Sequence, residues 1–129
     1  MAADAVLGLL GLARRANKLA CGEDKVKEMA MSGKCRVICL ASDAGDGVRR
    51  KAKLKNVPML ALPYDRQTLG NAVGLQRECA ICAIDDIGMA NALANKLAGI
   101  NGNQQAAAEI SSKKARIDAR KGKKKKGTA

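Results

Sequence analysis

Apolar and polar residues follow two patterns along this chain. In some segments the apolar residues recur at the spacing of a helix, and in others they form nearly continuous runs. Within residues 4–16, Val6, Leu10 and Ala13 recur at the spacing of a helix that buries one face. The same spacing returns over 23–31 and ends before Gly33, a residue type that commonly stops helices. The pattern as a whole predicts helices over 4–16, 23–31, 66–74 and 88–97, and a polar surface helix within 43–56 that begins near Gly45.

Near-continuous apolar runs interrupt the helical pattern. Residues 35–42, 57–63 and 79–85 are rich in Val, Ile, Leu, Ala or Cys, as are strands covered on both faces. Residues 18–21 form a shorter strand or an extended link. Helices that alternate with buried strands predict an α/β fold, in the form of a three-layer α/β/α sandwich.

The pattern changes after residue 98. Residues 99–129 include few large apolar side chains and end in the lysine-rich stretch KGKKKKGTA. Such a segment cannot bury enough apolar surface to fold alone, so its middle forms at most a transient helix and its end stays disordered. We therefore expect one domain over 1–98 and a basic, largely disordered C-terminal tail over 99–129.

The charge of the chain indicates a class of partner. There are 24 Lys+Arg against 12 Asp+Glu, a formal net charge of +12. Residues 1–100 hold 15 and 10 of these, and residues 101–129 hold the remaining 9 and 2. A basic body with a still more basic tail favours a polyanionic partner, nucleic acid more often than an anionic membrane.

Composition excludes other classes. Histidine is absent, which removes the commonest general base and metal ligand. The apolar run AVLGLLGLA is too short to span a bilayer, and Asp4 precedes it where a signal peptide carries positive charge. We expect a cytoplasmic protein with no membrane partner, whose five cysteines are reduced.

The cysteines suggest a metal or redox site, above all Cys79 and Cys82 in the sequence CAIC. On a strand, however, residues three apart point to opposite faces, so this pair cannot close on one metal ion. Cys35 and Cys39 share a face on the same argument but lie roughly 13 Å apart at about 3.3 Å per residue. The spacing favours small buried side chains, with no metal and no cofactor.

Aspartates follow the predicted strands, at the position where α/β enzymes place magnesium ligands. They are Asp43, Asp46, Asp85 and Asp86. They support a competing hypothesis, a magnesium-dependent phosphoryl-transfer or phospho-receiver protein. No Walker glycine loop and no lysine directly after the last strand accompany them, and helix capping accounts for the same residues.

The segment Gly22-Glu23-Asp24 places two carboxylates at a predicted helix start in a basic protein. Carboxylates in a first helical turn are stabilised by the helix dipole, by about 0.3–1 kcal/mol each. The cations around this helix start are Arg14, Arg15, Lys18, Lys25, Lys27 and Lys34. Cations hold phosphates and carboxylates accept hydrogen bonds from base amino groups, so the mixture also fits a surface that reads bases.

Four longer stretches carry a resemblance to a known family. In order they are LLGLARRANKLACGEDKVKEM, CRVICLASDA, KNVPMLALPYDRQTLGNAVG and CAICAIDDIGMANAL. They resemble the kink-turn RNA-binding ribosomal protein superfamily (the L7Ae-like proteins), and the LLGLA opening and Gly-Glu-Asp turn are most similar to its bacterial YlxQ-type branch. The resemblance spans about residues 7–97, which leaves the tail outside it.

The resemblance implies a sandwich around a four-stranded mixed sheet, without catalysis. It implies that the helix start after the first short strand and the loop before the last strand contact RNA. The implied RNA-binding residues are Lys18, Gly22, Glu23, Asp24, Lys25, Glu28, Leu75, Gln76, Arg77 and Glu78. Kink-turn binders typically carry Asn-Glu in place of Asp24-Lys25 and a lysine in place of Glu28, so the charge is reversed at positions 25 and 28.

These observations predict a small, non-catalytic, monomeric RNA-binding protein of the cytoplasm. The expected partner is kink-turn-like or other structured RNA, ribosomal RNA above all. Two alternatives stay open: the magnesium-dependent phosphoryl protein, and a protein-binding module on the same fold that has lost RNA binding.

Overall fold

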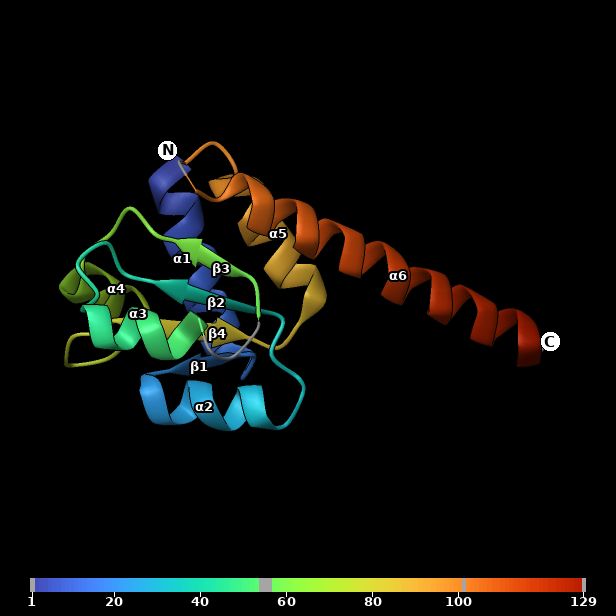
Figure 1. Cartoon of the computed structure of the whole chain (residues 1–129), viewed down its shortest axis with the longest axis horizontal. Helices are drawn as coiled ribbons and strands as arrows, with labels where there is room; N and C mark the ends of the chain where they lie inside the picture. The colour runs from blue at the N-terminus through green and yellow to red at the C-terminus, as the bar shows by residue number, and fades with distance from the viewer. Residues whose placement is uncertain (1, 54–56, 101, 129) are drawn as a thin grey trace.

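The computed structural model describes residues 2–53, 57–100 and 102–128, with side chains from residue 5 to residue 120 (Figure 1). Its helices are α1 (Ala2–Arg15), α2 (Glu23–Met31), α3 (Asp46–Lys53), α4 (Arg66–Ala72), α5 (Ile87–Leu97) and α6 (Gln104–Thr128). Its strands are β1 (Leu19–Cys21), β2 (Val37–Leu40), β3 (Met59–Ala61) and β4 (Ile81–Ile84). The helices and strands predicted between residues 4 and 97 are present with shifted ends; residues 54–56 of the predicted surface helix lie outside the described residues.

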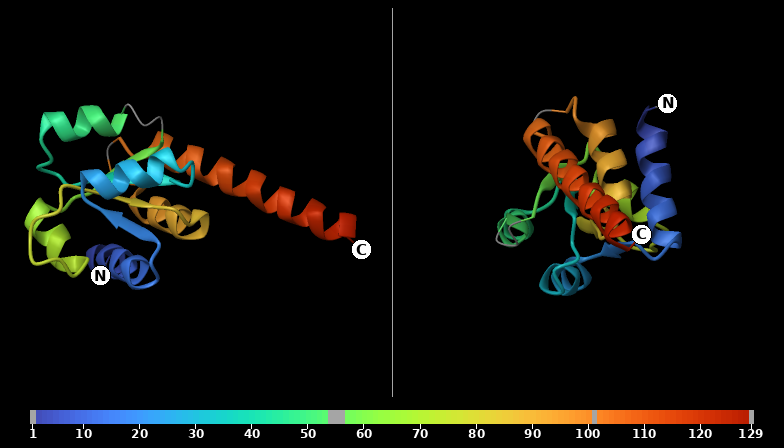
Figure 2. Two further views of the ribbon diagram at one scale, coloured as in Figure 1. Left: turned by 90° about the horizontal axis from the view of Figure 1, so that it is seen from below. Right: turned by 90° about the vertical axis from the view of Figure 1, so that its right-hand side faces the viewer.

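The strands form one four-stranded sheet in the order β1-β4-β2-β3. β4 runs antiparallel to both of its neighbours, β1 and β2, whereas β2 and β3 are parallel. The last strand of the chain therefore lies inside the sheet, and the loop that precedes it comes beside the end of β1. Helices cover both faces (Figure 2), which confirms the predicted α/β/α sandwich around a mixed sheet.

Side chains of the strands pack into a hydrophobic core on each face of the sheet, because neighbouring residues of a strand point to opposite sides. On one face, α1, α4 and α5 bury Leu10, Leu69 and Leu93 completely. On the other face, α2 and α3 contribute Val26 and Ala52. Because α2 packs on one face of the sheet and α4 on the other, the same sheet positions both α2 and the loop that follows α4.

The chain beyond residue 98 differs from the prediction. A largely disordered tail was expected from residue 99, but Gln104–Thr128 forms one helix that extends away from the body (Figure 1). Its first turns pack on α5 and bury Ala106, Ala107 and Ile110 in the core. These residues belong to the folded body, so the predicted boundary at residue 98 falls too early.

Asn103 anchors the start of α6. Its side-chain oxygen accepts a hydrogen bond from the backbone N–H of Ala61 at 2.7 Å. Its amide nitrogen donates to the carbonyl oxygens of Ala61 at 2.9 Å and Leu97 at 3.2 Å. The amide group therefore pairs with the outer strand β3 as a neighbouring strand would, and ties that strand to the end of α5.

The cysteines require a correction. Cys79 precedes β4 instead of lying in it, and its side chain shares one core with Cys82. Cys35 precedes β2 and faces the core under α2 and α3, whereas Cys39 faces the opposite core. The sequence placed Cys79 and Cys82 on opposite faces of one strand, and Cys35 and Cys39 on the same face of another. Both predictions were wrong, because Cys79 and Cys35 lie before the strands and the alternation of strand side chains does not extend to them. All five cysteines are buried and free, and the described residues contain no cluster of Cys, Asp or Glu that could hold a metal ion.

Candidate nucleic-acid interface

Gly22 turns the chain from β1 into α2. Its φ of 90° lies in the left-handed region, which other residue types adopt only with strain. Its N–H donates a hydrogen bond to the carbonyl of Ile81 at 2.9 Å, which fixes the corner against β4. A glycine has no side chain with which to cap a helix, so the first turn of α2 presents its backbone N–H groups.

The loop before β4 is positioned by the motif LGNAVG, residues 69–74. A Cβ atom on Gly70 would overlap with the carbonyl oxygen of Arg77, so only glycine lets the loop lie this close to α4. Gly74 has a φ of 79° and turns the chain back after the helix. The motif that distinguishes this sequence therefore folds residues 75–78 against α4.

The loop and the start of α2 meet at one edge of the molecule. They enclose a hollow of about 240 Å³, whose walls include Gly22, Glu23, Leu75, Arg77 and Glu78. Two segments that are far apart in the sequence thus form one continuous surface.

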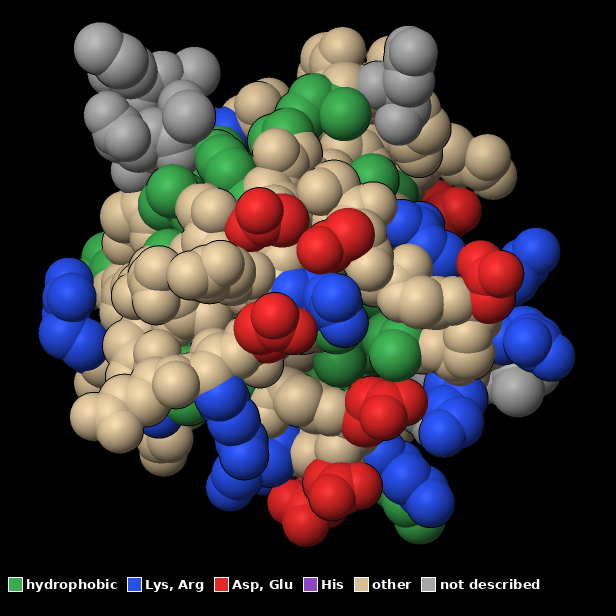
Figure 3. All heavy atoms as spheres, turned by 90° about the vertical axis from the view of Figure 1, so that its left-hand side faces the viewer, with side chains coloured by type: hydrophobic (Ala, Val, Ile, Leu, Met, Phe, Trp, Pro, Cys, Tyr) green, Lys and Arg blue, Asp and Glu red, His purple; other side chains and the backbone are tan. Residues whose placement is uncertain are grey.

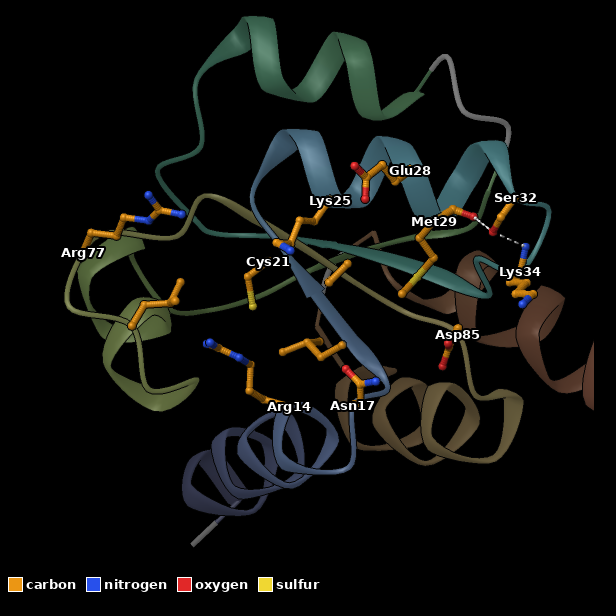
Figure 4. A pocket seen from close by; sticks show the side chains of 13 residues that line it. Arg14, Asn17, Cys21, Lys25, Glu28, Met29, Ser32, Lys34, Arg77 and Asp85 are labelled. Atoms are coloured by element: carbon orange, nitrogen blue, oxygen red, sulfur yellow. Dashed lines mark hydrogen bonds between the residues drawn. The ribbon is translucent and has the colours of Figure 1, made fainter.

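A larger pocket of about 620 Å³ opens beside this hollow (Figure 4). Lys25 and Glu28 lie on the face of α2 that lines it, and helical spacing brings Met29 and Ser32 to the same face. The loop before β4 contributes Leu75 and Arg77. The remaining lining residues are Arg14, Asn17, Leu19, Ala20, Cys21, Lys34 and Asp85.

Cations outnumber carboxylates around this pocket: Arg14, Lys25, Lys34 and Arg77 against Glu28 and Asp85. The Arg14 guanidinium is held by a hydrogen bond to the carbonyl of Val73 at 2.6 Å. One oxygen of Asp85, Oδ1, is buried without a hydrogen-bond partner among the described residues. The pocket therefore combines positive charge with one exposed carboxylate, that of Glu28, which a ligand can reach.

Glu23 borders a second hollow as well, and Asp24 lines only that second one. Together with Lys27 and Lys51 they line about 340 Å³ between α2 and α3. Glu23 Oε1 lies 3.6 Å from Lys51 Nζ, but the two side chains are 48% and 70% exposed, so this ion pair adds little stability and is easily exchanged. Acidic and basic side chains are interspersed across this side of the molecule (Figure 3).

The structure brings together most, but not all, of the residues that the sequence indicated. Lys18, Asp24 and Gln76 are exposed and line neither the 620 Å³ pocket nor the 240 Å³ hollow. Conversely, Asn17, Ser32 and Asp85 line the larger pocket but were not assigned to RNA. Ser32 follows Glu28 by four residues, a helical spacing that the sequence could have revealed.

The four aspartates of the magnesium hypothesis do not converge. β2 and β4 are antiparallel, so Asp43 and Asp46 follow one end of the sheet while Asp85 and Asp86 follow the opposite end. Asp43 pairs with Arg66 at 3.4 Å, and Asp86 caps α5 by accepting from the N–H of Met89 at 2.9 Å. This geometry does not favour the phosphoryl-transfer alternative.

Two buried thiols lie beside the junction of the α2 start with the loop before β4. The Cys79 thiol donates a hydrogen bond to the carbonyl oxygen of Ile81 at 3.2 Å. The interaction with Cys21, together with the backbone of Ile81 and Gly22 and the Arg14 charge, lowers the pKa of Cys79 despite burial. The interaction with Cys79, together with burial, raises the pKa of Cys21.

Comparison with known proteins places the sequence in one family. The model of the ribosomal protein L7Ae/L30e/S12e/Gadd45 family matches residues 4–94. RNA-binding protein YlxQ of Bacillus subtilis (strain 168) is 32% identical over 93 residues, which are 69% of this chain and 91% of that protein. The family match includes the start of α2 and the loop before β4.

Solved structures show the same fold. A Bacillus halodurans protein of unknown function superposes with a TM-score of 0.64 at 32% identity, covering 71% of this chain and 95% of that one. A Giardia lamblia 15.5kD RNA binding protein superposes with a TM-score of 0.57 at 16% identity, covering 75% and 85%. In the part of this chain that the structure describes, every helix is too short or too polar to cross a membrane.

Proposed function

The chain belongs to the ribosomal protein L7Ae/L30e/S12e/Gadd45 family, and from this membership and the geometry of one edge we propose that it is a non-catalytic RNA-binding protein. The observation that carries the proposal is the junction of the α2 start with the loop of residues 75–78 beside a pocket in which cations outnumber carboxylates. The name of the Bacillus subtilis relative, an RNA-binding protein, supports the same conclusion.

We further propose that the partner is structured RNA with unpaired bases, of the kink-turn or ribosomal kind, bound by a cytoplasmic monomer. Paired A-form RNA hides its base edges in a deep, narrow groove, whereas loops and bulges offer bases that side chains can reach. A pocket of about 620 Å³ with charged and apolar walls suits such an extruded base. Lys25 and Glu28, whose charges are opposite to those of typical kink-turn binders, make the preferred RNA different in sequence from theirs.

Each type of side chain has a separate role in this proposal. Lys25, Lys34 and Arg77 neutralise phosphates, which gives affinity without sequence preference. The carboxylates Glu23 and Asp24 accept hydrogen bonds from base amino groups, which cations cannot do. The chain has no Phe or Trp, so bases stack on aliphatic and guanidinium surfaces in place of aromatic rings.

The test is affinity for an RNA identified by crosslinking in cells, compared with a scrambled RNA at one salt concentration. Replacing Glu23 by Gln and Asp24 by Asn should weaken binding to the identified RNA by about 1–3 kcal/mol, because hydrogen bonds to bases are removed. Binding to the scrambled RNA should hold or strengthen, since negative charge repels phosphate. Equal losses of affinity for both RNAs, or no loss for either, would mean that Glu23 and Asp24 interact only with the helix dipole and do not read bases.

A matched lysine pair separates the proposed surface from general charge. Lys25→Ala should weaken binding to both RNAs, because Lys25 lines the pocket, whereas Lys96→Ala in the last turn of α5 should not. If neither RNA binds the unmodified protein, the alternative of a protein-binding module on this fold is supported instead.

A further inference from the structure

The two edge strands of the sheet differ in what covers them. In the order β1-β4-β2-β3, the strands β1 and β3 each have only one neighbour. At the β3 edge, the N–H and carbonyl of Ala61 are paired with the side chain of Asn103, and α6 packs beside the strand. At the opposite edge, no described residue covers the backbone of β1 in this way.

The hydrogen bonds of β1 show which of its residues face β4. The N–H of Asp85 donates to the carbonyl of Lys18 at 3.2 Å, and the N–H of Gly22 donates to the carbonyl of Ile81 at 2.9 Å. Alternate residues of an antiparallel strand bond to the same neighbour, so Ala20 also faces β4.

Leu19 and Cys21 occupy the intervening positions, so their N–H and carbonyl groups point to the free edge. No hydrogen bond to these outward groups is present among the described residues. Such a row of unpaired backbone groups is a template on which a further strand can form.

The 620 Å³ pocket runs along this free edge (Figure 4). All three residues of β1 line the pocket, so the strand forms its floor. α1 contributes Arg14 to one wall, and α2 contributes Lys25 and Met29 to the other. A strand edge that lies open between two helices suits an extended peptide, which gains affinity from main-chain hydrogen bonds and specificity from its alternate side chains.

The walls of the pocket indicate the chemistry of such a peptide. Arg77 and Lys34 lie at the two ends, and Arg14 lies between them on the α1 wall (Figure 4). On the α2 wall, Met29 packs against the core that includes Ala20 and supplies apolar surface. Successive side chains of an added strand point to opposite walls, so acidic residues that face Arg14 and apolar residues that face Met29 fit together.

Other occupants fit this edge less well. RNA phosphates are acceptors only, so they leave the outward carbonyls of Leu19 and Cys21 without donors, whereas a peptide strand supplies both groups. A second copy of this chain, paired through its own β1, would bring the same cations together. The lysine-rich residues 121–129 would be repelled in the same way. The charges therefore favour an acidic segment of another protein.

We propose that the free edge of β1 is a docking site for an extended segment of a partner protein in which acidic and apolar residues alternate. The segment adds to the sheet beside β1 and fills the pocket that the proposed function assigns to an RNA base. Partner protein and RNA therefore exclude one another. This exclusion rests on the proposed function, whereas pairing of the segment with β1 does not.

The experiment uses the full-length protein and the synthetic peptide acetyl-DVDVDVDV-amide. The peptide should shift the backbone amide NMR signals of Leu19 and Cys21 more than that of Met59 at the opposite edge. The basic peptide acetyl-KVKVKVKV-amide should bind at least about tenfold more weakly, because its charges repel the pocket cations. Of two acidic peptides, N-methylated at every Val or at every Asp, the one whose methyl groups face β1 should also lose about tenfold in affinity.

A matched pair of proline variants tests the edge from the side of the protein. Leu19→Pro removes an outward N–H that makes no bond within the sheet, a position at which edge strands tolerate proline. It should weaken binding of the acidic peptide by about threefold to tenfold. Met59→Pro makes the same change at the β3 edge and should leave peptide affinity unchanged. If Leu19→Pro does not fold, the methylated peptides decide the question with the unmodified protein.

Competition with RNA completes the test. The apparent Kd of the crosslink-identified RNA should rise about tenfold when the acidic peptide is present at about ten times its own Kd. The inference is overturned if the acidic peptide does not bind, if the basic peptide binds as well, if neither methylated peptide loses affinity, or if RNA stays bound while the peptide fills the groove. A protein that binds no RNA contradicts the proposed function, and the peptide measurements still decide whether β1 accepts a strand.

Discussion

Gly70 is the residue on which the position of the loop before β4 depends most directly. A Cβ there would overlap with the carbonyl oxygen of Arg77, and backbone cannot move aside as a flexible side chain can. We expect Gly70→Ala to lower the free energy of unfolding by about 1–3 kcal/mol, the usual cost of overpacking. It should also weaken RNA binding, because Arg77 and its neighbours are displaced from the edge.

Gly8 gives the matched control at this scale. It lies on the exposed side of α1, and a Cβ there would meet no heavy atom within 4 Å. Gly8→Ala should therefore stabilise the protein by roughly 0.5–1 kcal/mol and leave RNA affinity unchanged. Urea denaturation and RNA titration of both variants measure the contrast; similar behaviour of the two alanines would remove the special role of Gly70.

Among the elements, α6 depends on a single polar residue for its attachment to the sheet. Asn103 is buried, and its side chain makes three hydrogen bonds to the backbone of β3 and α5. Asn103→Ala should cost about 1–3 kcal/mol, because the N–H and carbonyl of Ala61 lose their partner at the edge of the sheet. Asn95→Ala, at an exposed position of α5, should change stability by less than about 0.5 kcal/mol. Denaturant midpoints of the two variants test this, and equal midpoints would contradict it.

The elements also show how far the sequence could predict this protein. Helical spacing and apolar runs are local signals, and they located α1 to α5 and all the strands. The packing of α6 has no comparable signal, because Ala106 and Ala107 are small and the hydrogen bonds of Asn103 reach a strand far away in the sequence. The start of α2 and its charges could be predicted as a site. The convergence of Asp85 on it could not, because it depends on β4 lying antiparallel beside β1.

At the scale of the whole molecule, positive charge is divided between a folded body and an extended arm. The body holds the pocket at one edge, and α6 leads away from it (Figure 2). Residues 121–129 carry five lysines and no acidic side chain. Such an arm adds phosphate contacts that depend on salt but do not select a base, so we assign part of the affinity to the arm and the specificity to the body.

This division predicts the behaviour of a chain that ends at Arg120. The buried part of α6, Ala106 to Ile110, remains, so the thermal midpoint should stay close to that of the full chain. The slope of log affinity against log salt should flatten by roughly 0.7–0.9 for each phosphate that the arm no longer neutralises, while the preference for the identified RNA over the scrambled one persists. A full-length variant with Gln in place of the five lysines of residues 121–126 separates charge from length, and should match the truncated chain. An unchanged slope in both variants would show that the arm does not touch phosphates, and the salt dependence would then have to come from the pocket cations alone.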